Sequence, residues 1–179
     1  MNQSVILTVV GSDRPGLTRA IADAVYAAGG NWLESHLARL GGKYVGSVLV
    51  ELPGDRLAEL ETAARAIDAV GLTVAIVPAS GEGVDRQRAG GGQPLDIEIV
   101  GQDRPGIVRE VTTVLAGLDV NIEDFTTMIE GSAWSGAPLF RGRARLLLPA
   151  HQSTERVRAA LEAISSEIMV DFGPQAETA

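Results

Sequence analysis

The sequence predicts an α+β protein of two consecutive βαββαβ modules, each an antiparallel sheet with its helices on one face. Three observations lead to this expectation: an internal repeat, a glycine-rich stretch between its copies, and regular alternation of strand-like and helix-like apolar patterns. The segment Val9–Leu17 returns in closely similar form ninety positions later as Ile99–Ile107, which indicates a duplication. We therefore expect a first domain at residues 1–79, a linker at 80–92, a second domain at 93–175 and a tail at 176–179.

The first half opens with an apolar, β-branched run at residues 5–10, which is typical of a buried strand. A helix should follow, because apolar residues then recur on one helical face: Leu17, Ile21, Val25 and Ala28. Asp13 is expected to cap this helix by accepting a hydrogen bond from a free backbone amide of its first turn. Pro15 suits the same turn because its fixed φ needs no amide there.

The rest of the first half predicts a hairpin, a helix and a last strand. Residues 32–40 and 44–52 read as strands, and Gly41 and Gly42 between them supply the positive φ of a tight hairpin. The second helix has an apolar face made by Leu57, Leu60, Ala64 and Ile67. Residues 72–77 then form the fourth strand.

The second half repeats this order. A strand is predicted at 95–100, two further strands on either side of residues 131–138, and a last strand at 168–172. The first helix of this half carries Ile107, Val111, Leu115 and Leu118 on its apolar face, and the second carries Val157, Leu161 and Ile164.

Composition narrows the classes of function. The chain has 23 acidic and 15 basic residues and a net charge of -8, which opposes binding to a phosphate backbone. It has no cysteine, which excludes disulfides, thiolate zinc sites and thiol nucleophiles. No apolar stretch approaches the roughly 20 residues that span a bilayer, and the N-terminus lacks a targeting pattern. We expect a soluble cytoplasmic protein without direct nucleic-acid or membrane contacts.

The strand-to-helix turns are the candidate ligand sites. Free amides at a helix start can hold a carboxylate, and glycines permit close backbone approach. Asn31 and Asn121, which open the next strands, can offer a donor and an acceptor to the charged ends of an amino acid. The candidate residues are Gly11, Ser12, Asp13, Arg14, Gly16, Asn31, Gly101, Gln102, Asp103, Arg104, Gly106 and Asn121.

Two considerations temper that interpretation. Glycine, aspartate, proline and asparagine at these positions are also what turns and helix starts require without any ligand. The halves differ at Ser12 against Gln102 and at Trp32 against Ile122, which favours unequal sites.

A candidate protein interface lies in the second half. Arg141, Arg143 and Arg145 alternate with apolar residues such as Phe140, so the three guanidinium groups should share one face of a strand. Trp134 stands among small residues just before this strand, where an aromatic side chain can anchor a partner. We take Trp134, Phe140, Arg141 and Arg143 as interface candidates, and a solvated strand face as the alternative.

Catalytic chemistry has little support. His36 and His151 are the only histidines, and neither belongs to a metal-ligand or nucleophile motif. The glycine turns lack the spacing of dinucleotide-binding and P-loop fingerprints. We expect no catalytic residue, no metal and no cofactor.

The segment Asp13–Leu17 with Asn31, and Asp103–Ile107 with Asn121, resembles the ACT domain, a ferredoxin-like module. The tandem arrangement resembles the glycine cleavage system transcriptional repressor family. This resemblance implies that an amino acid, with glycine suggested, binds near the first strand-to-helix loop and the following asparagine, often where two modules pair. It also implies that binding changes association with a protein partner such as a transcription activator, and a homodimer is compatible with it.

Three functions remain open on the sequence alone. The first is an amino-acid-responsive regulator of glycine or one-carbon metabolism that performs no catalysis. The second is a constitutive protein-interaction module in which the turns serve only as turns. The third, an enzyme, lacks any constellation of nucleophile, base and orienting group.

Overall fold

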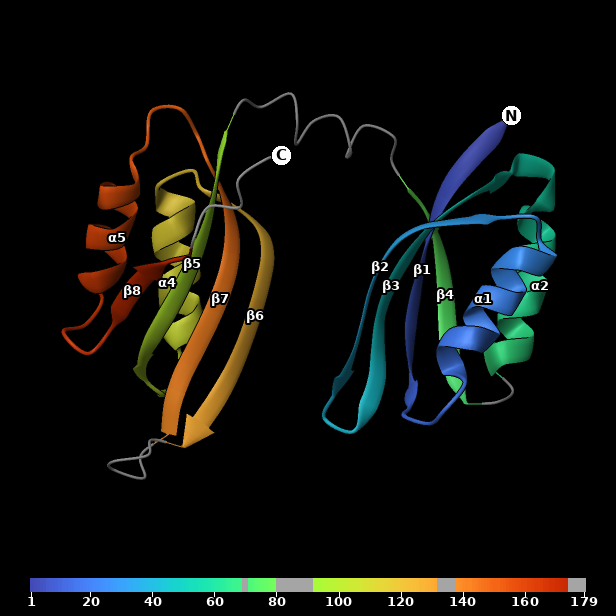
Figure 1. Cartoon of the computed structure of the whole chain (residues 1–179), viewed down its shortest axis with the longest axis horizontal. Helices are drawn as coiled ribbons and strands as arrows, with labels where there is room; N and C mark the ends of the chain where they lie inside the picture. The colour runs from blue at the N-terminus through green and yellow to red at the C-terminus, as the bar shows by residue number, and fades with distance from the viewer. Residues whose placement is uncertain (69–70, 80–91, 132–137, 174–179) are drawn as a thin grey trace. The chain divides into compact units, whose positions relative to one another are not determined.

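The computed structural model describes residues 1–68, 71–79, 92–131 and 138–173. The chain divides into two compact units, Met1–Asp85 and Arg86–Ala179. The division falls inside the glycine-rich stretch. Each unit is described by itself below (Figure 1).

The first unit has the order βαββαβ. Its four strands form one antiparallel sheet in the order β2-β3-β1-β4, and both helices cover the same face of that sheet (Figure 1). The elements are β1 (Asn2–Ser12), α1 (Leu17–Ala27), β2 (Asn31–Leu40), β3 (Lys43–Pro53), a 3₁₀ turn (Gly54–Arg56), α2 (Leu57–Asp68) and β4 (Leu72–Pro78).

The second unit repeats that order and topology. Its antiparallel sheet has the order β6-β7-β5-β8, again with both helices on one face. The elements are β5 (Gln93–Gln102), α4 (Ile107–Gly117), β6 (Asn121–Gly131), β7 (Pro138–Leu148), α5 (Thr154–Glu162) and β8 (Met169–Phe172). The predicted fold class, two βαββαβ modules with helices on one sheet face, is confirmed.

Each unit has its own apolar core between sheet and helices. On β1, Val5, Leu7 and Val9 alternate with more exposed residues, as expected for a strand covered on one face. The apolar faces predicted for α1 and α4 are buried against these sheets through Leu17, Ile21 and Val25 in one unit and Ile107, Val111 and Leu115 in the other.

The turns follow the glycines, with one correction. Gly41 and Gly42 have φ values of 57° and 77° and form the predicted hairpin. Asp13 does not cap α1, because the cap position is Gly16, at φ 93°, and no side chain makes a capping hydrogen bond there. The helix starts after Gly16 rather than at Pro15, so Asp13 is too far back along the chain to reach the first turn.

Candidate functional site

The turn between β5 and α4 opens onto a pocket of about 360 Å³. The polar part of its lining comes from the turn and from Thr127 of β6. The apolar part comes from α4, the edge strand β6 and the beginning of β7. The lining residues are Asp103, Arg104, Gly106, Ile107, Val108, Thr127, Met128, Ile129 and Phe140.

Two of the charged side chains at this pocket pair with each other, and a third is unpaired among the described residues. The Arg104 guanidinium donates to both carboxylate oxygens of Glu110, at 2.7 Å from Nη1 to Oε1. This pairing raises the pKa of Arg104 and lowers the pKa of Glu110. The backbone amide of Asp103 donates to the Pro138 carbonyl at 3.0 Å. Among the residues that the structure describes, the Asp103 carboxylate has no hydrogen-bond or ion-pair partner.

Apolar side chains stand beside this free carboxylate. Val108, Met128 and Ile129 are 41%, 45% and 54% exposed, which is high for residues of their size. Phe140, at 2% exposed, lies beneath them. The pocket therefore combines a carboxylate with an apolar wall that a ligand would cover.

The start of α4 adds hydrogen-bond donors. Gly106 has φ 93°, and the first bond within the helix is donated by the Glu110 amide to the Gly106 carbonyl at 3.0 Å. Helix geometry leaves the amides of Val108 and Arg109 without an acceptor inside the helix. Such amides favour a carboxylate at this end of the helix.

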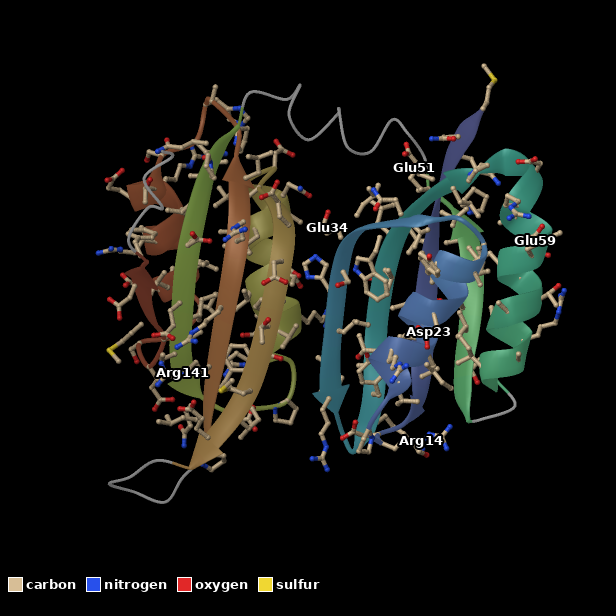
Figure 2. The ribbon with its side chains drawn as sticks, turned by 45° about the vertical axis from the view of Figure 1, so that its right-hand side comes forward. Arg14, Asp23, Glu34, Glu51, Glu59 and Arg141 are labelled. Atoms are coloured by element: carbon tan, nitrogen blue, oxygen red, sulfur yellow. The ribbon has the colours of Figure 1, made fainter. Side chains whose placement is uncertain are left out.

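The corresponding turn of the first unit is engaged differently. Asp13 pairs with Arg39 of β2 at 3.3 Å, and Lys43 of β3 donates to the Ser12 hydroxyl at 3.2 Å. Arg14 is exposed at this turn (Figure 2). Gly11 approaches the last strand so closely that a Cβ there would meet the Gly71 carbonyl at 2.4 Å. Gly11 thus serves packing between β1 and β4.

The asparagines do not lie with the turns. Asn121 is in register with Leu147, which is in register with Pro94, whereas Gln102 next to the turn is in register with Leu139. Eight residues of strand separate these two rows, or about 27 Å. Asn31 and Ser12 stand in the same relation in the first sheet. Within one unit, a single amino acid cannot contact both the turn and the asparagine.

The interface candidates fall into three groups. Arg141 and Arg143 lie on the outer face of the second sheet, and both pair with Glu98, at 2.9 and 2.8 Å; Figure 2 labels Arg141. Phe140 is buried in the core, because it points to the helix side of the strand, so it offers no surface to a partner. Trp134 lies outside the described residues.

The arginine face is a ladder of ion pairs. Arg141 also pairs with Glu130 at 3.1 Å, and Arg145 pairs with Asp96 at 3.2 Å. Hydrogen bonds from Arg143 first and Arg141 second lower the pKa of Glu98. The predicted sharing of one face is confirmed, and acidic neighbours balance the positive charge there. A pocket of about 390 Å³ on this face includes Asp96, Glu98, Arg143 and Arg145.

Other site chemistry is sparse in the part of the chain that the structure describes. The His36 ring lies 3.1 Å from Glu34 on the exposed face of β2. Within residues 1–68, 71–79, 92–131 and 138–173, no group of three histidine or acidic side chains is placed to hold a metal ion. No helix in these ranges is long and apolar enough to cross a membrane.

Sequence reasoning named the turn as a candidate site but did not include Glu110 or the apolar residues that line the pocket. A signal for the wall was present: ninety positions after Arg39, which pairs with Asp13, the chain has Ile129. The contact between β2 and the turn was needed to see that this difference bears on the site.

The comparisons with known proteins agree with this architecture. An ACT domain model matches residues 3–76, and a second matches residues 96–166. A protein of unknown function from Galdieria sulphuraria is 27% identical, with a TM-score of 0.75, over 96% of this chain and 98% of its own. The structure of a candidate glycine cleavage system transcriptional repressor is 15% identical, with a TM-score of 0.68, over 98% and 99%. No curated protein matches the chain. With both halves matched, the chain belongs to the ACT domain family.

Proposed function

We propose that this protein is a non-catalytic regulatory protein that binds a small amino acid and thereby changes its association with a protein partner. The observation that carries the proposal is the pocket at the turn between β5 and α4, where a carboxylate without a partner among the described residues adjoins helix-start amides and an apolar wall.

The pocket's chemistry suits a zwitterion. The Asp103 carboxylate can accept hydrogen bonds from an α-ammonium group. The amides of Val108 and Arg109 can donate to the α-carboxylate, and the positive end of the α4 dipole favours that charge. Glu110 already accepts hydrogen bonds from both Nη atoms of Arg104 and balances its charge. We therefore assign the backbone amides, rather than the guanidinium, to the ligand's α-carboxylate.

The asparagines enter this proposal only through a second copy of the module. Since Asn121 is about 27 Å along the strand from its own turn, a ligand that contacts both would need the asparagine from another copy, for example in a homodimer. In the proposed primary site, the turn and its pocket act without it.

The finer proposal is a regulator of transcription in glycine or one-carbon metabolism, with glycine as the effector and a DNA-binding activator as the partner. The full-length likeness to the candidate repressor supports this role. The net charge of -8 supports action through a protein rather than on DNA directly. A cytoplasmic location accords with it.

Thermal unfolding of the full chain in the presence of each of the twenty amino acids, at millimolar concentration, tests the proposal. A ligand at 100 times its dissociation constant adds about 2.7 kcal/mol to the free energy of unfolding. We expect a shift in Tm with glycine or a chemically similar small amino acid. Asp103→Asn should abolish the shift, and Asp171→Asn, which alters a carboxylate on β8 outside this pocket, should retain it.

A constitutive interaction module is the second candidate. The bonds that already engage Asp13 and Ser12 in the first unit favour it, because they show that this turn can be satisfied internally. If no amino acid shifts Tm, the interaction module becomes the better account, and the regulator proposal is wrong.

A further inference from the structure

The two turns share a backbone but differ in what surrounds the aspartate. Both place a glycine at φ 93° before the helix, and Asp13 corresponds to Asp103 at the offset of ninety. In the first unit the Arg39 guanidinium lies 3.3 Å from the Asp13 carboxylate. The position that corresponds to Arg39 is Ile129, which lines the pocket beside Asp103.

A second cation is exchanged in the same way. Lys43 stands opposite Ser12 in the register of β1 and β3 and donates to its hydroxyl. In the second sheet the residue opposite Gln102 is Leu139. The neighbouring strands thus bring two cations to the first turn and two apolar side chains to the second.

These two differences between the units determine at which turn the ammonium group of a ligand can bind favourably. At the first turn, Arg39 already satisfies the carboxylate, and Lys43 and Arg14 add positive charge nearby. At the second turn, the one cation at the turn itself, Arg104, is paired with Glu110. The ammonium group of an amino acid would meet repulsion and a competing cation at the first turn but an open carboxylate at the second.

We propose, resting on the function proposed above, that the chain has one amino-acid site, at the second turn. Arg39 closes the first turn by occupying the carboxylate that a ligand's ammonium group would need. The first unit therefore binds no ligand. The side chain at position 39 or 129 has the largest effect on binding, because Arg39 is the cation that pairs with the aspartate itself.

Amide chemical-shift mapping of the ¹⁵N-labelled full chain tests this directly, since it reports each turn separately. Glycine, L-serine and L-leucine serve as probes, titrated one at a time. We expect saturable shifts at residues 102–109 with at least one probe, and none at the corresponding residues 12–19.

Two reciprocal variants sharpen the test. Ile129→Arg should close the second turn by recreating the pair with aspartate, and binding there should fall at least tenfold. Arg39→Ile should open the first turn, so that residues 12–19 now respond to the same probe. Arg19→Ile, which removes another exposed arginine of the first unit, is the matched control and should leave that turn silent. The dispersion of the spectra shows that each variant remains folded.

The outcomes separate the two proposals. Equal responses at both turns of the unaltered chain, or full binding by Ile129→Arg, would overturn the single site while leaving an amino-acid sensor in place. No response at either turn to any probe would overturn both proposals.

Discussion

At the two turns, one set of residues determines the backbone conformation and a different set determines the charge around the aspartate. Gly16 and Gly106 provide the left-handed backbone that ends each turn, while Arg39 and Ile129 determine whether the aspartate is free. Ligand binding can therefore change without disturbing the fold, because the residues that differ lie on the surface rather than in the core.

The glycine requirement is testable at residue 106. A Cβ at Gly106 would meet no atom within 4 Å, so any loss of stability in Gly106→Ala comes from forcing φ 93° on an L residue. We expect a loss of about 1 kcal/mol in the free energy of unfolding. Gly117→Ala, at the end of α4 and equally uncrowded, is the control and should stabilise the protein slightly. Urea denaturation measures both, and equal effects of the two changes would refute the backbone explanation.

Glu98 makes stability depend on acid pH. Its pKa is held below the ordinary 4.5 by hydrogen bonds from Arg143 and Arg141. A carboxyl with a lowered folded-state pKa stabilises the protein above its unfolded-state pKa, and the stabilisation is lost as pH falls through the folded-state value. Stability should therefore decline below about pH 4.5, and Glu98→Gln should flatten part of that decline. Denaturant titrations between pH 3 and 7 of the unaltered chain and of Glu98→Gln check this, and identical slopes below about pH 4.5 in the two proteins would contradict it.

At the scale of elements, strand direction determines which residues can meet. Asn121 is close to Asp103 in sequence terms, but the helix between them returns the chain to the far end of the sheet before β6 begins. The turn and the asparagine of one unit therefore cannot contact the same small ligand. Arg39 is farther from Asp13 in sequence than Asn121 is from Asp103, yet these two side chains do meet, because β2 runs back toward the turn.

The starts of α1 and α4 differ from the start of α5. α1 and α4 begin after glycines without a side-chain cap, whereas α5 is capped by Ser153, whose hydroxyl accepts a hydrogen bond from the Arg156 amide at 3.2 Å. We expect Ser153→Ala to lower the free energy of unfolding by about 1 kcal/mol. The Ser165 hydroxyl also accepts a backbone hydrogen bond, from the Glu167 amide at 3.2 Å, but it caps no helix, so we expect a smaller loss for Ser165→Ala. Thermal and urea unfolding check the order, and a larger loss at Ser165 would contradict it.

Much of the architecture was predictable because it is encoded locally. Helical and strand periodicities identified the apolar faces, and the repeat identified the topology twice. The way α1 is capped could not be predicted locally. Asp13 is a residue type that commonly caps helices, but the helix starts only after Gly16, which is in the αL conformation, so the Asp13 side chain does not reach the amides of the first turn. The wall of the pocket was missed because it is made by β6, whose position beside the turn depends on sheet register.

At the scale of the whole molecule, each unit has a complete core of its own. We therefore predict that residues 1–79 and 93–175 fold when expressed separately. Each fragment should give a dispersed amide spectrum and unfold cooperatively in urea. A fragment that stays collapsed and without dispersion would show that one unit needs the other to fold.

The duplication gives the protein an internal reference. The turn with the Asp13–Arg39 pair and the turn with Asp103, whose carboxylate has no partner among the described residues, occur in one molecule. Both turns are therefore measured at the same concentration, temperature and ionic strength, so a difference in their response to a solute cannot come from a difference between two samples. Raising the salt concentration should weaken the exposed Asp13–Arg39 pair. The response of the first turn to a ligand would then become more like that of the second turn. The size of this change would measure how much the Asp13–Arg39 ion pair contributes to the difference between the two turns.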